Sequence, residues 1–294
     1  MNGWTGAILH IDLSEQTHWV EHPDTDRYHR LIGGKGLAGH YLRPKVTLPW
    51  DAPDMPLIFM SGPLVGTPSP TSGRLHVISR SPLTGTVGDA SVGGSLGTQL
   101  KRAGYDGLVL TGRCGGLTGI EITDNAVLFR DARALAGLDT ETVHKKIKGK
   151  GATAVIGPAA EWGVLFATIM VDGAYAVGRN GLGCVFAGKN LKYLAVKGSG
   201  SVAVCDREGL KKAREDILRL IASSPVLLGE QGLTHYGTGA LYDLMDSRRM
   251  MPTANFRATW FPPAHTLNAP AYKKRYGDRH TGCQGCHIRC KRVA

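Results

Sequence analysis

Residues 93–112, GGSLGTQLKRAGYDGLVLTG, run from a glycine-rich turn through a short helical segment into a strand that ends in glycine. Residues 180–198, NGLGCVFAGKNLKYLAVKG, follow the same order. A plan that recurs within one chain indicates a repeated structural unit. We therefore expect two related halves in this part of the protein, each with a glycine-rich turn that precedes a helix.

The sequence around the two turns is rich in strand candidates. Short apolar or alternating stretches bounded by turn residues predict strands, here at 5–13, 17–21, 56–60, 74–79, 107–112, 153–157, 164–170 and 191–198. Residues 119–131 predict a hairpin around Asp124 and Asn125. Helices are expected over 94–103 and over 139–148, the second beginning at an Asp-Thr cap.

The pattern changes near residue 203. Residues 206–224 carry apolar side chains at helical spacing, and 239–250 and 268–277 also predict helices. These features predict an α+β fold. A duplicated β-rich domain is expected over 1–203, followed over 204–294 by the beginning of a mostly helical domain.

Each glycine-rich turn would open a helix, whose N-terminal amides and partial positive charge favour a phosphate. Glycines also serve simple turns, and the two interpretations carry about equal weight. The stretch GGKG at 33–36 lacks the Gly-Lys-Ser/Thr ending of a P-loop, and no GxGxxG follows a strand in a Rossmann pattern. We expect Asp106, Glu161 and Asp172 to be surface charges or caps rather than acid–base catalysts.

The chain has 294 residues, forty glycines and a formal net charge of +11. This charge indicates either a solvated basic surface or an acidic partner. No helix-turn-helix, RNP or zinc-finger pattern supports nucleic-acid binding. No apolar run is long enough to span a membrane, and the first residues do not resemble a signal peptide, so a cytoplasmic location is expected.

Three cysteines lie close together in the final stretch, TGCQGCHIRCKRVA. The Cys-x2-Cys-x3-Cys spacing of Cys283, Cys286 and Cys290 favours a metal over disulfides in a cytoplasmic protein. An iron–sulfur cluster accepts three close thiolates with a remote fourth ligand. A Cys3His zinc site completed by His280 or His287 is the alternative. It would make the protein a non-catalytic zinc-binding module with a basic surface for an acidic partner.

The chain also resembles the aldehyde:ferredoxin oxidoreductase family along nearly its whole length. The matching stretches, in order, are GWTGAILHIDLS, GGKGLAGHYL, SGPLVGTPSPTSGRLHVISRSPLTG, GGSLGTQLKRAGYDGLVLTG, IGPAAEWGVLFATIMVDG, GRNGLGCVFAGKNLKYLAVKG and CQGCHIRC. Family members hold tungsten or molybdenum between two pterin dithiolenes, beside one [4Fe–4S] cluster. They oxidise aldehydes to carboxylic acids. They are also longer, so the resemblance covers their N-terminal portion.

The resemblance implies partners and assigns roles to particular residues. It implies ferredoxin or another iron–sulfur carrier as electron acceptor and a small aldehyde as substrate, with a homo-oligomer as one option. Neither nucleic acid nor a membrane is expected as a partner. Cys283, Cys286 and Cys290 correspond to three ligands of the cluster. Arg74 corresponds to the arginine between cluster and pterin.

The resemblance further implies two cofactor loops, made by Ser91, Gly93, Gly94, Ala176, Gly178 and Arg179. Ser91 stands where the family often has an asparagine, whose backbone carbonyl binds a magnesium ion that bridges the two pterin phosphates. Tyr175 departs from a basic residue found at that position in some members. No catalytic acid–base residue is assigned within this chain.

Overall fold

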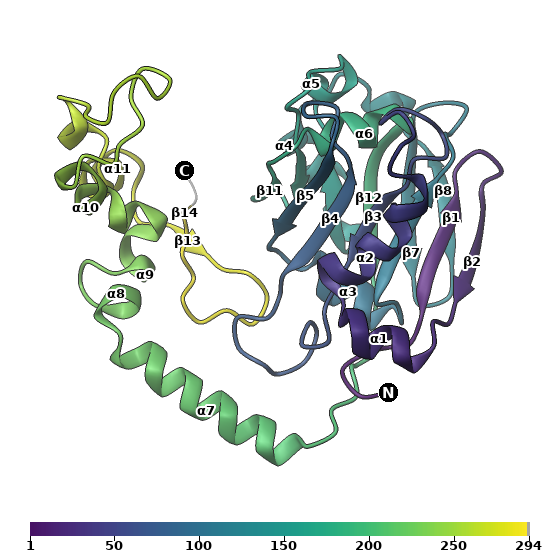
Figure 1. Ribbon diagram of the computed structural model, residues 1–294, viewed down its shortest axis with the longest axis horizontal. Coiled ribbons are helices and arrows are strands. Elements are labelled where there is room, and N and C mark those ends of the chain that lie inside the picture. The colour runs from purple at the N-terminus through teal and green to yellow at the C-terminus, as the bar shows by residue number, and fades with distance from the viewer. Residues whose placement is uncertain (293–294) are drawn as a thin grey trace. The chain divides into compact units, whose positions relative to one another are not determined.

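The computed structural model describes residues 1–292, so Val293 and Ala294 lie outside the described residues. The chain divides into two compact units, Met1–Arg207 and Glu208–Ala294. The first unit contains two six-stranded sheets and the second is mostly helical (Figure 1). The predicted α+β class is confirmed.

The two sheets have the same topology. In the first, the strand order is β2–β1–β6–β3–β4–β5, and in the second it is β8–β7–β12–β9–β10–β11. The first sheet consists of β1 (Ile8–Asp12), β2 (Thr17–Glu21), β3 (Leu57–Met60), β4 (Leu75–Arg80), β5 (Val87–Val92) and β6 (Gly107–Thr111). The second consists of β7 (Thr118–Thr123), β8 (Val127–Asp131), β9 (Ala152–Val155), β10 (Ile169–Val171), β11 (Tyr175–Val177) and β12 (Leu191–Lys197).

The strand directions also agree. β1 pairs parallel with β6 and β7 pairs parallel with β12, whereas the remaining neighbours in both sheets are antiparallel. A single helix leads from the edge strand back to the centre in each half: α3 (Leu96–Arg102) in the first and α6 (Leu182–Gly188) in the second. The predicted duplication is therefore confirmed, strand by strand.

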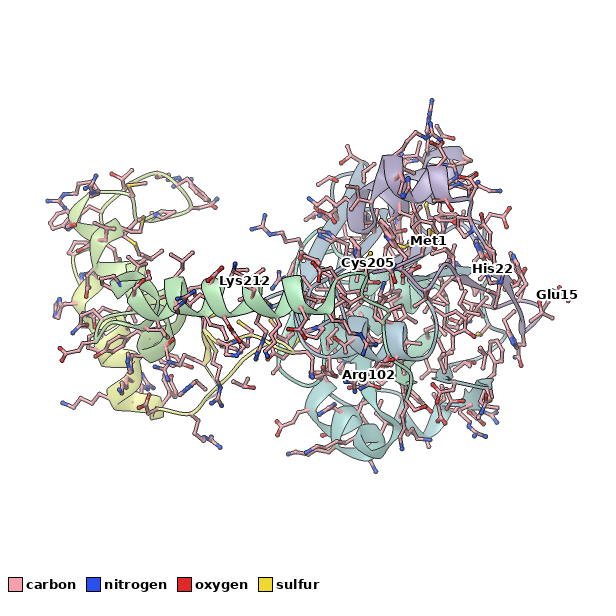
Figure 2. All side chains as sticks on the ribbon, turned by 90° about the horizontal axis from the view of Figure 1, so that it is seen from below. Met1, Glu15, His22, Arg102, Cys205 and Lys212 are labelled. Carbon is pink, nitrogen blue, oxygen red and sulfur yellow. The ribbon has the colours of Figure 1, made fainter. Side chains whose placement is uncertain are left out.

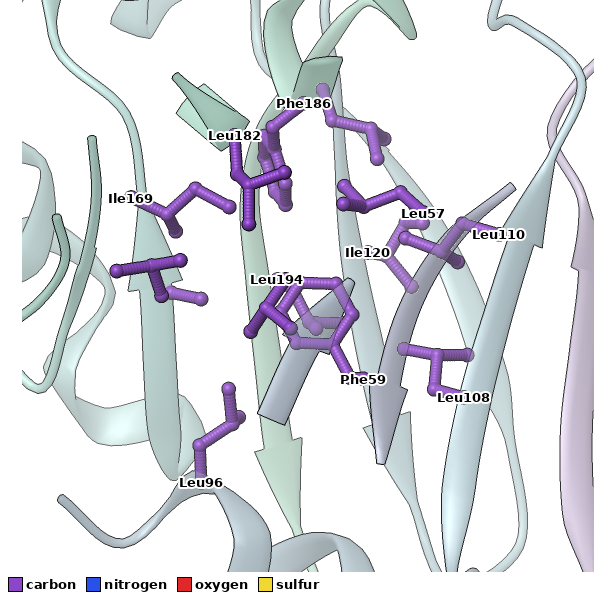
Figure 3. Packing of buried hydrophobic residues seen from close by; sticks show 14 of the residues in the cluster. Leu57, Phe59, Leu96, Leu108, Leu110, Ile120, Ile169, Leu182, Phe186 and Leu194 are labelled. Carbon is purple, nitrogen blue, oxygen red and sulfur yellow. The ribbon is translucent and has the colours of Figure 1, made fainter. Parts of the chain in front are cut away.

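Side-chain alternation places the core between the sheets. Leu57 and Phe59 of β3 belong to the large central cluster, while Ile58 and Met60 belong to a second cluster beneath α1 (Thr25–Leu31) and α2 (Gly34–Leu42). Figure 3 shows Phe59 and other first-sheet residues close to Leu194 of the second sheet. Both faces of β3 are buried, which explains its uninterrupted apolar sequence.

The second sheet repeats this arrangement. Tyr193 and Ala195 of β12 form a third cluster with Val143 and Ile147 of α4 (Thr140–Ile147). The backbone amide of Thr142 donates to the Asp139 carboxylate at 2.8 Å, so the predicted cap of this helix is confirmed. The first unit thus has four layers: α1 and α2, the first sheet, the second sheet, and α4.

One predicted strand was misplaced. Residues 164–170 were expected to form a strand, but β10 occupies Ile169–Val171 and residues 164–168 form a turn. Leu165 and Phe166 in that turn are 45% and 72% exposed. Four smaller elements complete the first unit: the 3-10 turns Arg43–Lys45, Arg133–Leu135 and Lys148–Lys150, and the short helix α5 (Pro158–Glu161).

The expectation that Asp106 is a surface charge or cap was wrong. Asp106 is 1% exposed and pairs with the equally buried Lys101. Its carboxylate also accepts hydrogen bonds from Tyr28 Oη at 2.9 Å and from the backbone amides of Thr5 and Gly6. Buried charges require such partners, and here the partners tie the N-terminal segment to the sheet.

In its described residues, 208–292, the second unit contains five helices and a small hairpin. The helices are α7 (Arg207–Ser223), α8 (Pro225–Leu228), α9 (Leu233–Tyr236), α10 (Tyr242–Ser247) and α11 (Ala269–Tyr276), with strands β13 (His280–Thr281) and β14 (Lys291–Arg292). The first of these helices, α7, begins at the boundary between the units. The helices predicted over 206–224 and 268–277 are confirmed. The segment 239–250 differs, because a 3-10 turn over Gly237–Leu241 precedes α10; a second 3-10 turn covers Ala264–Thr266.

Lys212 lies on α7 and its side chain is exposed (Figure 2). Of the helices described in residues 1–292, none combines the length and apolar character that crossing a bilayer would require.

Candidate functional site

The candidate site lies where the two halves of the first unit meet. β5 and β11 are the equivalent edge strands of the two sheets, and they contact each other. A cavity of about 440 Å³ opens beside them, a volume typical of small-molecule sites. It is lined by Lys35, Arg74, Asp89, Ala90, Ser91, Ala176, Gly178 and Arg179.

The two halves contribute equivalent positions to this cavity. Ser91 is the penultimate residue of β5 and Ala176 is the penultimate residue of β11. Two positions further along, Gly93 corresponds to Gly178. The duplicated fold thus brings together turns that are 85 residues apart in sequence, as the positions 91 and 176 show.

Most of the cofactor residues implied by the resemblance line the cavity, but Gly93 and Gly94 do not. Both are buried. Gly94 has a φ of +92°, and a Cβ atom there would lie 2.7 Å from Asp172 Oδ2. Glycine is required at position 94 because the turn packs against the other half of the domain.

Arg74 is held against Ser91 by two hydrogen bonds. Its Nε donates to Ser91 Oγ at 3.1 Å and its Nη2 donates to the Ser91 carbonyl at 2.9 Å. A planar guanidinium gains a fixed orientation from such paired contacts. The Ser91 carbonyl oxygen retains a second lone pair, so this contact does not prevent it from binding a metal ion.

Each turn is tied to the opposite half. Ser95, which follows the first turn, donates from its amide at 2.6 Å and from its hydroxyl at 2.8 Å to Asp172 Oδ2. Asn180, which follows the second, donates from its side-chain amide to the Asp89 carbonyl at 2.9 Å, and its own carbonyl accepts from Ser81 Oγ at 2.9 Å. These reciprocal contacts fix the two turns relative to each other.

The same contacts argue against phosphates at the helix N-termini. The Ser95 amide at the start of α3 is bonded to Asp172, and the Gly183 amide at the start of α6 is bonded to the Ala167 carbonyl at 3.0 Å. A phosphate would have to displace both partners. The positive groups available to an anion are instead the side chains of the cavity, and Asp172 is a cross-link between the halves rather than a surface charge.

Two charged cavity residues were missed from the sequence, as was the neighbouring Ala90. Lys35 Nζ lies 2.6 Å from Asp89 Oδ2, and Asp89 Oδ1 lies 2.9 Å from His76 Nδ1. Burial alone would raise the pKa of Asp89, but the hydrogen bonds from Lys35 and His76 outweigh burial and hold the pKa below its ordinary value. Lys35 could have been found from its glycine-rich stretch GGKG. Asp89 lies on β5, a strand that was not predicted from the sequence.

Glu161 also differs from the surface charge that was expected. It pairs with Lys192, whose side chain is fully buried, and accepts a hydrogen bond from the Gly137 amide at 2.8 Å. Lys192 in addition donates to the Leu138 carbonyl at 2.9 Å. This network is structural and lies outside the Arg74 cavity.

The three cysteines lie on a loop of the second unit that β13 and β14 close. The Cys286 amide donates to the Cys283 carbonyl at 3.0 Å, and Cys290 directly precedes β14. Within residues 1–292, no three or more His, Cys, Asp or Glu side chains are gathered so that they could hold a metal ion. The structure therefore does not assemble the predicted cluster ligands, and it does not favour the zinc alternative with His280 or His287.

Comparisons with known proteins identify the family of this chain. Residues 8–198 match the family described as "Aldehyde ferredoxin oxidoreductase, N-terminal domain", and residues 212–294 match "Aldehyde ferredoxin oxidoreductase, domains 2 & 3". The tungsten-containing aldehyde ferredoxin oxidoreductases of Pyrococcus furiosus and Thermococcus kodakarensis are each 36% identical to this chain, over its full length and 49% of theirs. The chain therefore spans about half the length of these relatives.

More distant relatives include other redox enzymes. The aliphatic sulfonate oxidoreductase WOR-like subunit of Pyrococcus furiosus is 26% identical over all of this chain and half of its own. Among solved structures, the active-site complex BamBC of benzoyl coenzyme A reductase aligns with a TM-score of 0.80 and 25% identity, covering 98% of this chain and 47% of that one. The family match over residues 8–198, which is more than half of the chain, establishes that the chain belongs to the aldehyde ferredoxin oxidoreductase family.

Proposed function

We propose that this chain is the N-terminal, cofactor-carrying portion of a tungsten or molybdenum bis-pterin oxidoreductase that oxidises aldehydes to carboxylic acids. The observation that carries the proposal is the cavity between β5 and β11, where equivalent turns of the two halves lie beside Arg74 and Arg179. A cofactor built from two similar pterins suits a site built from two similar halves. When bound, the metal would supply the two-electron chemistry of aldehyde oxidation.

The residues of the cavity have separate tasks. Arg74 and Arg179 provide positive charge for the phosphate groups, and charge-assisted hydrogen bonds of this kind are stronger than neutral ones. The backbone carbonyls of Ser91 and Ala176 would hold a magnesium ion, which would offset the negative charge of the phosphates. Asp172 and Asn180 fix the spacing of the two turns through the contacts described above.

We also propose that Cys283, Cys286 and Cys290 provide three ligands of a [4Fe–4S] cluster. Spacing and family membership support this assignment, and the β13–β14 pairing holds the loop ends together. The electron acceptor would be ferredoxin or a similar iron–sulfur carrier. A basic protein with a net charge of +11 favours an acidic partner of this type.

The test is to produce the chain anaerobically with tungstate or molybdate and to measure its bound metal and pterin. We expect pterin to co-purify with the wild type and to fall several-fold in Arg179→Gln, whereas Arg133→Gln, an exposed arginine paired with Asp131 outside the cavity, should resemble the wild type. Pterin can be measured by its fluorescence after oxidation, independently of catalysis. A folded chain without pterin, or equal retention in Arg179→Gln, would refute the proposal.

A further inference from the structure

Lys35 is a cation of the cavity without an assigned role. It belongs to the GGKG stretch, which lacks the Gly-Lys-Ser/Thr ending of a P-loop, and it lies in the first turn of α2. Its ammonium group is 2.6 Å from Asp89 Oδ2, and its side chain remains 64% exposed. Lys35 can contact Asp89 because the start of α2 packs closely against β4. A Cβ atom on Gly34, for example, would lie 3.2 Å from the ring of His76.

The carboxylate of Asp89 has two side-chain partners, and one of them is enough to keep it hydrogen-bonded. His76 and Lys35 bind different oxygens of its carboxylate. The side chain of Asp89 is 22% exposed, so it retains some contact with water. If Lys35 turned to another anion, Asp89 would keep the hydrogen bond to His76 and would not become an isolated buried charge.

The alternation of side chains along β5 places Asp89 on the face of the first sheet that borders the cavity. Ala90 and Val92 face the core between the sheets, so Asp89 and Ser91 face the opposite side. Lys35, Arg74 and Arg179 line the cavity together with the single carboxylate of its lining, Asp89, and Lys35 contacts this carboxylate directly. The cavity therefore has a surplus of positive charge together with one anion that competes for it.

We propose that Lys35 binds a phosphate group of the ligand that occupies this cavity, exchanging its contact with Asp89 for that phosphate. Lys35 is thus a third phosphate-binding residue beside Arg74 and Arg179, and Asp89 is its competing anion. The inference rests on the proposed phosphate-bearing cofactor. It differs from a merely structural role, in which the Lys35–Asp89 ion pair would only attach α2 to the sheet.

Binding of inorganic pyrophosphate to the full chain, measured by calorimetry, distinguishes these roles. Lys35→Gln should raise the dissociation constant on the order of tenfold, as the loss of one charge-assisted contact predicts. Lys35→Arg should restore most of the affinity. Asp89→Asn should lower the dissociation constant, because it removes the competing anion. Lys145→Gln is the matched control, since Lys145 pairs with Glu141 on an exposed helix surface.

The opposite signs of the two effects are decisive. A structural ion pair would change binding in the same direction whichever partner was replaced, so parallel effects would overturn the inference. A second readout does not depend on a variant: pyrophosphate should slow acylation of Lys35 several-fold relative to Lys145, as measured by mass spectrometry.

Failure of this inference can be separated from failure of the proposed function. If Arg179→Gln weakens pyrophosphate binding and Lys35→Gln does not, the cavity binds phosphate without Lys35 and only the inference is lost. If both variants bind as the wild type does, the phosphate site itself is refuted. Circular dichroism of each variant establishes that the fold is retained.

Discussion

Deprotonation of the buried Lys189 should raise the free energy of unfolding of the first unit in alkaline solution. Its side chain is almost fully buried, and its ammonium group donates to the carbonyls of Pro53 and Gly112, each at 3.1 Å. No carboxylate within residues 1–292 forms an ion pair with it. Burial, followed by repulsion from Arg113, lowers the pKa of Lys189 from 10.5 to about 8. Between these two pH values the unfolded chain holds a proton that the folded chain has released.

The sign and size of the effect follow from this difference. The cost of burying the charged ammonium is fully present below pH 8 and disappears as the pH rises toward 10.5. The free energy of unfolding should therefore rise over this range by about 3 kcal/mol, at about 1.4 kcal/mol for each pKa unit. Lys189→Met cannot titrate and should lack this rise.

The assay is urea unfolding at a series of pH values, followed by tryptophan fluorescence. In a Trp260→Phe background the remaining tryptophans all belong to the first unit, so the signal reports its unfolding. The difference between the chain with Lys189 and the Lys189→Met variant removes contributions from other titrating groups. Lys146→Met, which alters an exposed lysine, is the control. A difference that stays constant from pH 7 to 10.5 would refute the reasoning.

Three other results are expected. Asp106→Asn should lower the free energy of unfolding by about 3–5 kcal/mol in the same assay, because it leaves a buried lysine without its counter-charge; a loss below about 1 kcal/mol would contradict the structure. Asp172→Asn should speed hydrogen exchange at the Ser95 amide at least several-fold and reduce bound pterin, and unchanged exchange would show that the cross-link does not hold the turn. Cys283→Ser should lose bound iron while Cys205→Ser retains it, and zinc in place of iron in the wild type would refute the cluster assignment.

The fold could be predicted from the sequence where buried elements left a clear pattern of apolar residues and glycines. The two stretches 93–112 and 180–198 revealed the duplication because each keeps its glycines, its helix and its buried strand. Central strands such as β3 are apolar on both faces, and sequence patterns detect such strands well. The cap at Asp139 was readable because its partner lies only three residues away.

The elements around the cavity were harder to predict. α2 contains three glycines, which disfavour a helix, and it is stabilised by the burial of Leu37, Ala38 and Leu42 against the first sheet. β5 reads VGDASV and β11 has only three residues, so neither has a strong strand signal of its own. The run VLFATIM misled the prediction because Leu165 and Phe166 are apolar yet exposed in a turn.

The candidate site depends on differences between two otherwise equivalent halves. In the alignment of the two turns, Gly94 of the first half corresponds to Arg179 of the second. The first half instead supplies Arg74 and Lys35 from other elements, together with the single carboxylate of Asp89. Equal folds provide matching backbone on the two sides of the cavity, whereas unequal side chains give it an asymmetric charge. The two similar parts of a ligand would therefore meet different side chains, with Arg179 on the second half and Arg74, Lys35 and Asp89 on the first.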